Sequence, residues 1–287
     1  MYRLTATLGG GIIMTIKLGD ILKQTRQAQH MTQKQLAEGI CSQSMLSAIE
    51  KGQYTPNANL LIALCRRLKI SLDDISLSSN FAIGRTRDFN QKLDRLCNQH
   101  QYQKLFDFLQ KPSVLDAIET DGQTQAYYYY LGVSKWHLQQ GLQDVAADFQ
   151  LSLASAQPTH LSVLTRLGMM SLAMVRTQLG QLRSSEKLLA QAVSDIETAE
   201  YEENLNIVFY LAGLICFESE HYAKTANWVL RGIDFATGHD SHYMLANLYY
   251  LLARTAEVEA QLDIHDDAQE RAKIFTELFH EKPYENF

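Results

Sequence analysis

Apolar positions recur every three or four residues along most of the chain, which is the period of amphipathic helices. Residues 17–77 read as several short helices with tight connections, whereas residues 87–280 read as longer helices in pairs. Only 4 prolines and 15 glycines occur among 287 residues, fewer than an all-β chain with many tight turns would need. The pattern therefore predicts an all-α protein with two regions of different texture.

The second region contains an internal repeat. Three turn-plus-helix segments resemble one another, at 141–146, 180–185 and 220–226, and a fourth ends near Ala268. A period near 40 residues built from helix pairs is typical of an α-solenoid, in which neighbouring hairpins bury one another's apolar faces. We expect about five hairpins over residues 88–280, with a concave groove of the kind that binds extended peptides or partner helices.

The first region carries the pattern of a helix-turn-helix unit. Thr32 and Ser42 stand where N-caps would begin two short helices, and Leu36, Ala37 and Ile49 would face inward. Small polar side chains near the start of the second of these helices suit base edges in the major groove, and the start of the first suits a phosphate. The residues expected to contact DNA are Thr32, Gln33, Lys34, Ser42, Gln43, Ser44, Ser47, Lys51 and Tyr54.

Three short motifs follow one another along the first region: T-Q-x-x-L-A, S-x-x-x-L-S-x-I-E-x-G and P-x-x-x-x-L. Their order and spacing resemble the Xre/phage-repressor (lambda-repressor-like) class of helix-turn-helix domain. This resemblance implies an ion pair between Arg26 and Glu50 that supports the domain and does not read bases. His30 stands where the family has glycine, so we expect a positive φ there. The connection GICSQS is one residue shorter than the family's commonest version.

That connection, together with the helical-repeat body, is similar to the PlcR-like branch of peptide-responsive regulators (the RRNPP group, with Rgg-type members). The body's share of the resemblance rests on LCNQHQYQKLFDFL, HYAKT and ANLYYLLA. It implies a TPR-like solenoid in a cytoplasmic homodimer from a Gram-positive bacterium that binds a palindromic operator in double-stranded DNA. It also implies control by a short secreted and re-imported signalling peptide, as in quorum sensing.

Polar and aromatic residues at i, i+4 spacing on the first helix of each hairpin are the candidates for holding such a peptide. They are Tyr129, Arg166, Met170, Met174, Gln178, Asn206, Tyr210, Tyr243, Asn247, Tyr250 and Arg254. The same spacing also fits core packing. Methionine or leucine replaces the asparagines that PlcR-like proteins use near positions 170, 174 and 211. An alternative is therefore a regulator or scaffold controlled by a protein partner, with no peptide ligand.

The expected organisation is a tail or an upstream start at 1–13, a helix-turn-helix domain of five helices at 14–75, a linker at 76–87 whose serines and glycine suggest a hinge, and the repeat domain at 88–287. Residues 14–75 hold eight Lys and Arg against five Asp and Glu, whereas residues 76–287 hold 17 against 27. Any polyanion should therefore bind the first domain.

Other functions have little support in the sequence. No phosphate-binding glycine motif and no G-x-S-x-G motif occurs, so we expect neither an enzyme nor a cofactor. His239 with His242, and His265 with its neighbouring aspartates, are incomplete as metal sites. No apolar run is long enough to cross a membrane, and four cysteines without a C-x-x-C pair fit a reducing cytoplasm.

Overall fold

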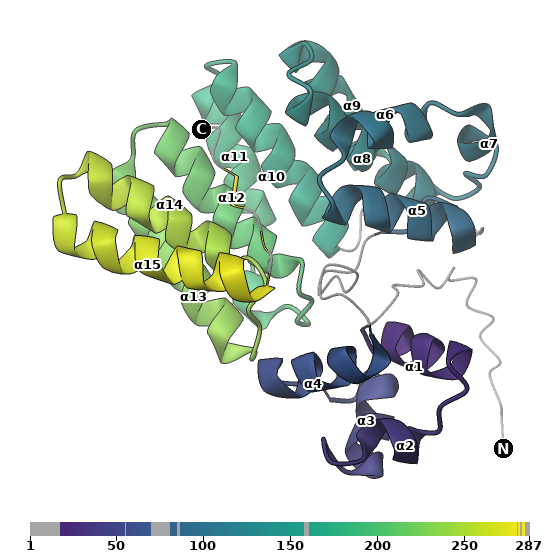
Figure 1. Ribbon diagram of the computed structural model, residues 1–287. Helices are drawn as coiled ribbons and strands as arrows, with labels where there is room; N and C mark the ends of the chain where they lie inside the picture. Colours follow the sequence, from purple (N-terminus) through teal and green to yellow (C-terminus); the bar gives the residue numbers. More distant parts are fainter. Residues whose placement is uncertain are drawn as a thin grey trace, which may run out of the picture.

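A computed structural model describes residues 18–54, 56–69, 81–84, 87–157, 161–279, 281 and 283–284. These residues form helices and loops, with no strand among them. Figure 1 shows a small group of helices, α1–α4, beside a larger stack of paired helices. The prediction of an all-α chain, with a helix-turn-helix domain followed by a TPR-like solenoid, is confirmed.

The first domain contains α1 (Leu18–Ala28), α2 (Gln33–Ala37), α3 (Gln43–Glu50) and α4 (Ala58–Leu68). Its core is separate from that of the solenoid and is built mainly from leucines that the helices turn inward, with Leu22, Leu36, Leu46 and Leu64 fully buried. We expected five helices here. Four lie within the described residues, and the stretch expected to hold the fifth falls outside them, as does the expected tail at 1–13.

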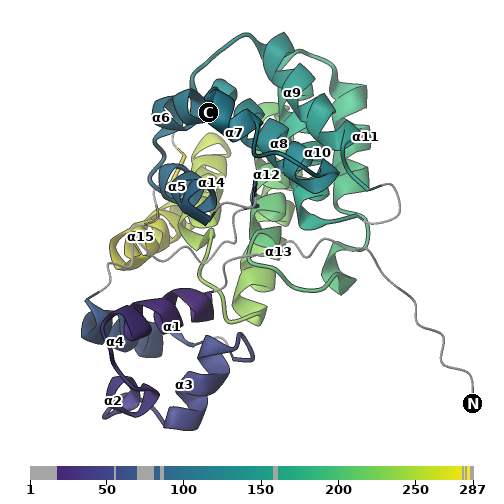
Figure 2. The same cartoon turned by 90° about the vertical axis from the view of Figure 1, so that its right-hand side faces the viewer.

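The solenoid consists of five successive helix pairs and one short extra helix. The pairs are α5 (Arg87–Asn98) with α6 (Tyr102–Leu109), α8 (Asp121–His137) with α9 (Leu142–Ala154), α10 (Val163–Gln178) with α11 (Leu182–Ala192), α12 (Leu205–Glu218) with α13 (Tyr222–Gly238), and α14 (Leu245–Val258) with α15 (Leu262–Phe279). The short helix is α7 (Pro112–Leu115), and a 3-10 turn, Ile196–Thr198, follows α11. The first helices α8, α10, α12 and α14 pack successively against one another (Figure 2), and we call their layer the inner face.

Close approach between paired helices depends on small residues. A methyl group added at Gly132 on α8 would lie 2.8–3.0 Å from three ring carbons of Phe149 on α9. Gly213 on α12 is similarly close to Val229 of α13, at 2.9 Å. The large side chains therefore fill the space that the glycines leave, as the repeat pattern predicts.

The described part of the expected linker belongs to the solenoid. Phe81 and Ile83 are buried in the solenoid core, and the Phe81 N–H donates a 2.7 Å hydrogen bond to the Tyr130 hydroxyl. The solenoid packing therefore begins by Phe81, before the expected boundary at residue 88. The serine- and glycine-rich composition that suggested a hinge did not reveal these two apolar anchors.

Candidate nucleic-acid interface and inner face of the solenoid

Both helices of the helix-turn-helix unit begin at a side-chain cap. The Thr32 hydroxyl accepts the Gln35 N–H at 3.2 Å, while the Gln35 side chain accepts the Thr32 N–H at 2.8 Å, which completes a capping box. The Ser42 hydroxyl accepts the Met45 N–H at 3.1 Å at the start of α3. These caps fix where each helix begins, and so they fix which side chains stand at the exposed end of α3.

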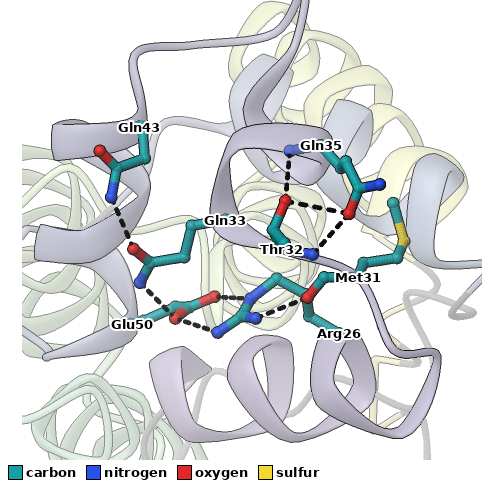
Figure 3. A network of polar contacts seen from close by, with 7 residues as sticks. All are labelled: Arg26, Met31, Thr32, Gln33, Gln35, Gln43 and Glu50. Carbon is teal, nitrogen blue, oxygen red and sulfur yellow. Dashed lines mark hydrogen bonds and ion pairs between the residues drawn. The ribbon is translucent and has the colours of Figure 1, made fainter.

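A chain of polar contacts connects the buried core of the first domain to that exposed end (Figure 3). The Arg26 guanidinium donates two hydrogen bonds to the Glu50 carboxylate, at 2.6 and 2.9 Å, and a third to the Met31 carbonyl at 2.7 Å. Glu50 also accepts the Gln33 amide at 2.8 Å, and Gln33 in turn accepts the Gln43 amide at 2.9 Å. The buried Arg26–Glu50 pair thus orients the Gln43 side chain through Gln33.

The ion pair at the base of this network is buried and charged. Burial alone would raise the pKa of the Glu50 carboxyl, but the bonds from Arg26 and Gln33 outweigh burial and lower the pKa overall. The bond to Glu50 raises the pKa of Arg26. Bidentate pairing of this kind favours both charged forms at neutral pH. The pairing implied by the sequence resemblance is confirmed.

The structure places the nine residues expected to contact DNA on α2, on α3 and on the segments beside them. Gln43, Ser44, Lys34, Lys51 and Tyr54 are exposed and have side chains that could reach a ligand. The Thr32 and Ser42 hydroxyls serve as caps, Gln33 is half-buried between Glu50 and Gln43, and Ser47 is also half-buried. Gln43 and Ser44 therefore present exposed polar side chains at the start of α3, and Gln33 holds the Gln43 side chain in place.

Two backbone features allow the unit to pack closely. His30 has φ +54°, so the positive φ expected at this position is confirmed, at a cost in strain for a non-glycine residue. At Gly19 on α1, an added methyl group would lie 2.1 Å from the Ile49 carbonyl oxygen. Only glycine fits there, which brings α1 against the end of α3.

On the inner face, the predicted pair Asn206 and Tyr210 is buried on α12. The Asn206 amide donates to the Tyr243 carbonyl at 3.0 Å and to the Ser241 hydroxyl at 3.2 Å. Its Oδ1 atom and the Tyr210 hydroxyl are both buried without a hydrogen-bond partner among the described residues. Burial raises the pKa of the Tyr210 hydroxyl, which therefore stays protonated and can donate. Unsatisfied buried polar atoms are uncommon and costly, which makes this pair the candidate ligand contact of the inner face.

Several other predicted peptide contacts have structural roles. Arg166 is buried and donates to the Ala192 and Ser194 carbonyls, at 2.6 and 2.7 Å, which ties α10 to the end of α11. Met170 and Met174 are core residues, and Tyr129 packs edge-on against Phe81 at 6.5 Å. The structure places these four side chains in the packed interior, and helical spacing alone does not distinguish an open face from a packed one.

The remaining predicted positions differ in accessibility. Gln178 is exposed and accepts the Trp136 indole N–H at 3.0 Å, whereas Arg254 pairs with Glu257 on its own helix. Tyr243 and Tyr250 are half-buried, and Asn247 is buried with its Oδ1 accepting the Tyr284 N–H at 3.0 Å. The inner-face residues that the structure brings near one another therefore come mainly from α12 and α14.

Sequence reasoning missed an aromatic cluster at the end of α8. The His137 ring stacks on Tyr102 with centroids 3.7 Å apart, and Trp136 and His137 both contact Tyr284, at 5.4 and 5.5 Å. Burial lowers the pKa of His137 to about 4, so its ring is neutral. Four aromatic residues from three distant parts of the chain meet here, and no local spacing could reveal this.

Two of the three histidines considered as metal ligands are involved in ring stacking, and the third, His265, pairs with Asp266. His239 stacks on Tyr201 at 4.0 Å, and His242 stacks on Phe279 at 3.6 Å. Across the described part of the chain, no group of three His, Cys, Asp or Glu side chains could hold a metal ion. None of the described helices combines the length and apolar character needed to span a bilayer.

A helix-turn-helix family model matches residues 22–75. The described residues within this range form a helix-turn-helix domain. No curated protein matched the sequence. Among solved structures, PlcR from Bacillus thuringiensis in complex with the peptide PapR7 and DNA is 21% identical, with a TM-score of 0.59, and the match covers 92% of this chain and 95% of that one. The apo form of the same protein gives 19% identity and a TM-score of 0.55, covering 92% and 94%. The fold of this chain, with a helix-turn-helix domain before a helical-repeat body, is therefore similar to that of PlcR.

Proposed function

We propose that this chain is a sequence-specific transcriptional regulator that binds double-stranded DNA through α2 and α3. The observation that carries the proposal is the Arg26–Glu50–Gln33–Gln43 network, which holds an exposed glutamine at the start of α3. A preorganised glutamine can bond an adenine edge twice, and the neighbouring Ser44 hydroxyl can bond several bases. Lys34 and Lys51 supply charge for phosphates on either side.

A homodimer fits this mode of binding. One small domain offers few base contacts, whereas two domains reading half-sites of a palindromic operator supply enough for tight binding. The chain resembles regulatory proteins in domain content and fold, and its activity under this proposal is binding without catalysis. The proposed setting is the cytoplasm, where such a domain meets DNA.

The proposal extends to a short peptide as the ligand of the inner face. Asn206 Oδ1 and the Tyr210 hydroxyl offer an acceptor and a donor one helical turn apart. A peptide backbone supplies the complementary N–H and C=O groups. The peptide that accompanies PlcR in its complex supports this ligand class by analogy of fold.

The DNA-binding claim is tested by selecting duplexes from a random library with the full-length chain. We expect enrichment of a palindrome, with an affinity that falls steeply as salt rises because bound phosphates release counterions. The double variant Gln43→Ala/Ser44→Ala should lose the preference for the selected duplex over a scrambled one while keeping its oligomeric state. The matched control Gln150→Ala changes an exposed glutamine on α9 and should behave as wild type. Unchanged discrimination in the double variant would exclude α3 as the reading helix.

The ligand claim is tested by screening a library of short peptides for binding to the full-length chain, then repeating the titration with Tyr210→Phe. A peptide that uses the hydroxyl should bind the variant about fivefold more weakly, since a buried hydrogen bond is worth about 1 kcal/mol. Equal binding by both proteins would place the peptide elsewhere.

A further inference from the structure

The residues that follow α15 turn back onto the inner face of the solenoid (Figure 1, the short yellow segment beside α12). The Glu281 carboxylate accepts the Met244 N–H at 2.6 Å and the Ala246 N–H at 3.0 Å, which are backbone donors at the start of α14. Three residues later, the Tyr284 N–H donates to Asn247 Oδ1. We call Glu281, Pro283 and Tyr284 the returning segment.

These contacts are those of a bound peptide. A side-chain amide of the inner face holds a backbone N–H of the segment, and a helix N-terminus holds one of its carboxylates, which its dipole favours. An aromatic ring of the segment then lies against the cluster at the end of α8. Backbone capture with a ring in an aromatic recess is a general mode of peptide recognition.

The Tyr284 hydroxyl also belongs to the electrostatic surroundings of Tyr210 and Tyr102, because it adds to the burial that raises the pKa of each of their hydroxyls. Through its contacts with Asn247 and Trp136, Tyr284 connects α14, in the fifth helix pair, to α8, in the second. An external peptide that used Asn247 and the aromatic cluster would therefore meet a site that is already filled.

We propose that the returning segment is an intramolecular ligand of the solenoid, and that any external peptide must displace it to reach Asn247 and the Trp136–His137 cluster. The existence of an external competing peptide rests on the proposed function, whereas the docking of the returning segment does not. The segment sets a threshold for the binding of an external peptide, because the two compete for the same site. A ligand tethered by a short linker has an effective concentration on the order of 1 mM. If the free segment binds with a Kd of about 100 µM, tethering weakens external binding about tenfold.

The chain offers a convenient reporter for this equilibrium. Trp136 and Trp228 are its two tryptophans, and Trp136 contacts both Tyr284 and Gln178. The Trp228→Phe background leaves Trp136 as the sole indole. In this background we compare the full chain, a Tyr284→Ala variant and a chain shortened to residue 279. Both changes should shift the Trp136 emission, while Tyr249→Ala, which alters a ring on α14 that stacks on Phe275, should not.

The decisive step adds the synthetic peptide HEKPYENF, the sequence of residues 280–287, to the shortened chain. We expect saturable binding that restores the emission of the full chain, with no binding by the peptide whose tyrosine is replaced by alanine. The full chain should bind the intact peptide at least tenfold more weakly than the shortened chain does. Circular dichroism checks that each variant is folded, and if the shortened chain is not, Tyr284→Ala in the full chain decides.

An unchanged Trp136 emission in Tyr284→Ala would overturn the inference, as would a folded shortened chain that ignores the peptide or equal peptide affinities for the full and shortened chains. Failure of the proposed function looks different. In that case no external peptide or duplex would be selected by the full chain, while HEKPYENF would still bind the shortened one.

Discussion

Replacing Glu50 by glutamine should destabilise the helix-turn-helix domain far more than its small change in shape suggests. The Glu50 side chain is 2% exposed and its partner Arg26 is 10% exposed, so Glu50→Gln leaves a buried guanidinium without a counter-charge. Breaking a buried pair by removing one partner costs about 3–5 kcal/mol. That is a large share of the stability of a small domain. Gln33 would also lose its charged acceptor, and Gln43 its support.

Hydrogen exchange followed by mass spectrometry suits this prediction, because it reports the first domain and the solenoid separately in the full chain. Amides in α1, α3 and α4 should exchange roughly a hundredfold or more faster, which is the rate factor for about 3 kcal/mol. Those in α10 and α12 should not change. The double variant Arg26→Met/Glu50→Leu removes both charges and should recover much of the loss. If Glu50→Gln changes exchange less than tenfold, the pair is not what organises this domain.

Three further predictions concern packing, capping and pH. Gly132→Ala should lower the stability of the solenoid by about 1–3 kcal/mol through overlap with Phe149, whereas Gly122→Ala on the same helix meets nothing within 4 Å and should be neutral or stabilising in the same thermal melt. Ser42→Ala should cost about 1 kcal/mol by removing the cap of α3, seen as faster exchange there, while Ser113→Ala at an exposed position should have no such effect. Burial raises the pKa of Glu281 to about 7, with the nearby Glu203 carboxylate adding to the rise, so docking of the returning segment should strengthen as pH falls below about 7 and should not depend on this group at higher pH, where the carboxyl is ionised in both states. Trp136 emission should follow that change, and Glu281→Gln should remove it.

Local signals in the sequence were enough to predict the helix-turn-helix unit. Thr32 and Ser42 are caps, and caps depend on side chains within three residues. The positive φ at His30 and the Arg26–Glu50 pair came from a family pattern with fixed spacing. In the solenoid, the repeat near 40 residues predicted the helix pairs because each pair buries its apolar face against its neighbours in the same way.

The parts that could not be predicted depend on contacts between distant segments. Arg166 was expected on the inner face, but the partner that decides its role is the backbone after α11. Tyr284 and Trp136 meet only because the helix pairs curve and the chain returns after α15. Neither residue carries a local signal for this contact, since an aromatic residue at a helix end or after a proline is ordinary.

The central claim is that α3 reads bases while its neighbours hold phosphates. The measurement that tests it most directly is the affinity of the full chain for a selected duplex and for a scrambled one, repeated with Lys34→Ala and with Gln43→Ala/Ser44→Ala. We predict that Lys34→Ala weakens binding to both duplexes by the same factor and that the double variant weakens binding to the selected duplex alone. Equal affinities of the wild-type chain for the two duplexes, or a double variant that still separates them, would contradict the account.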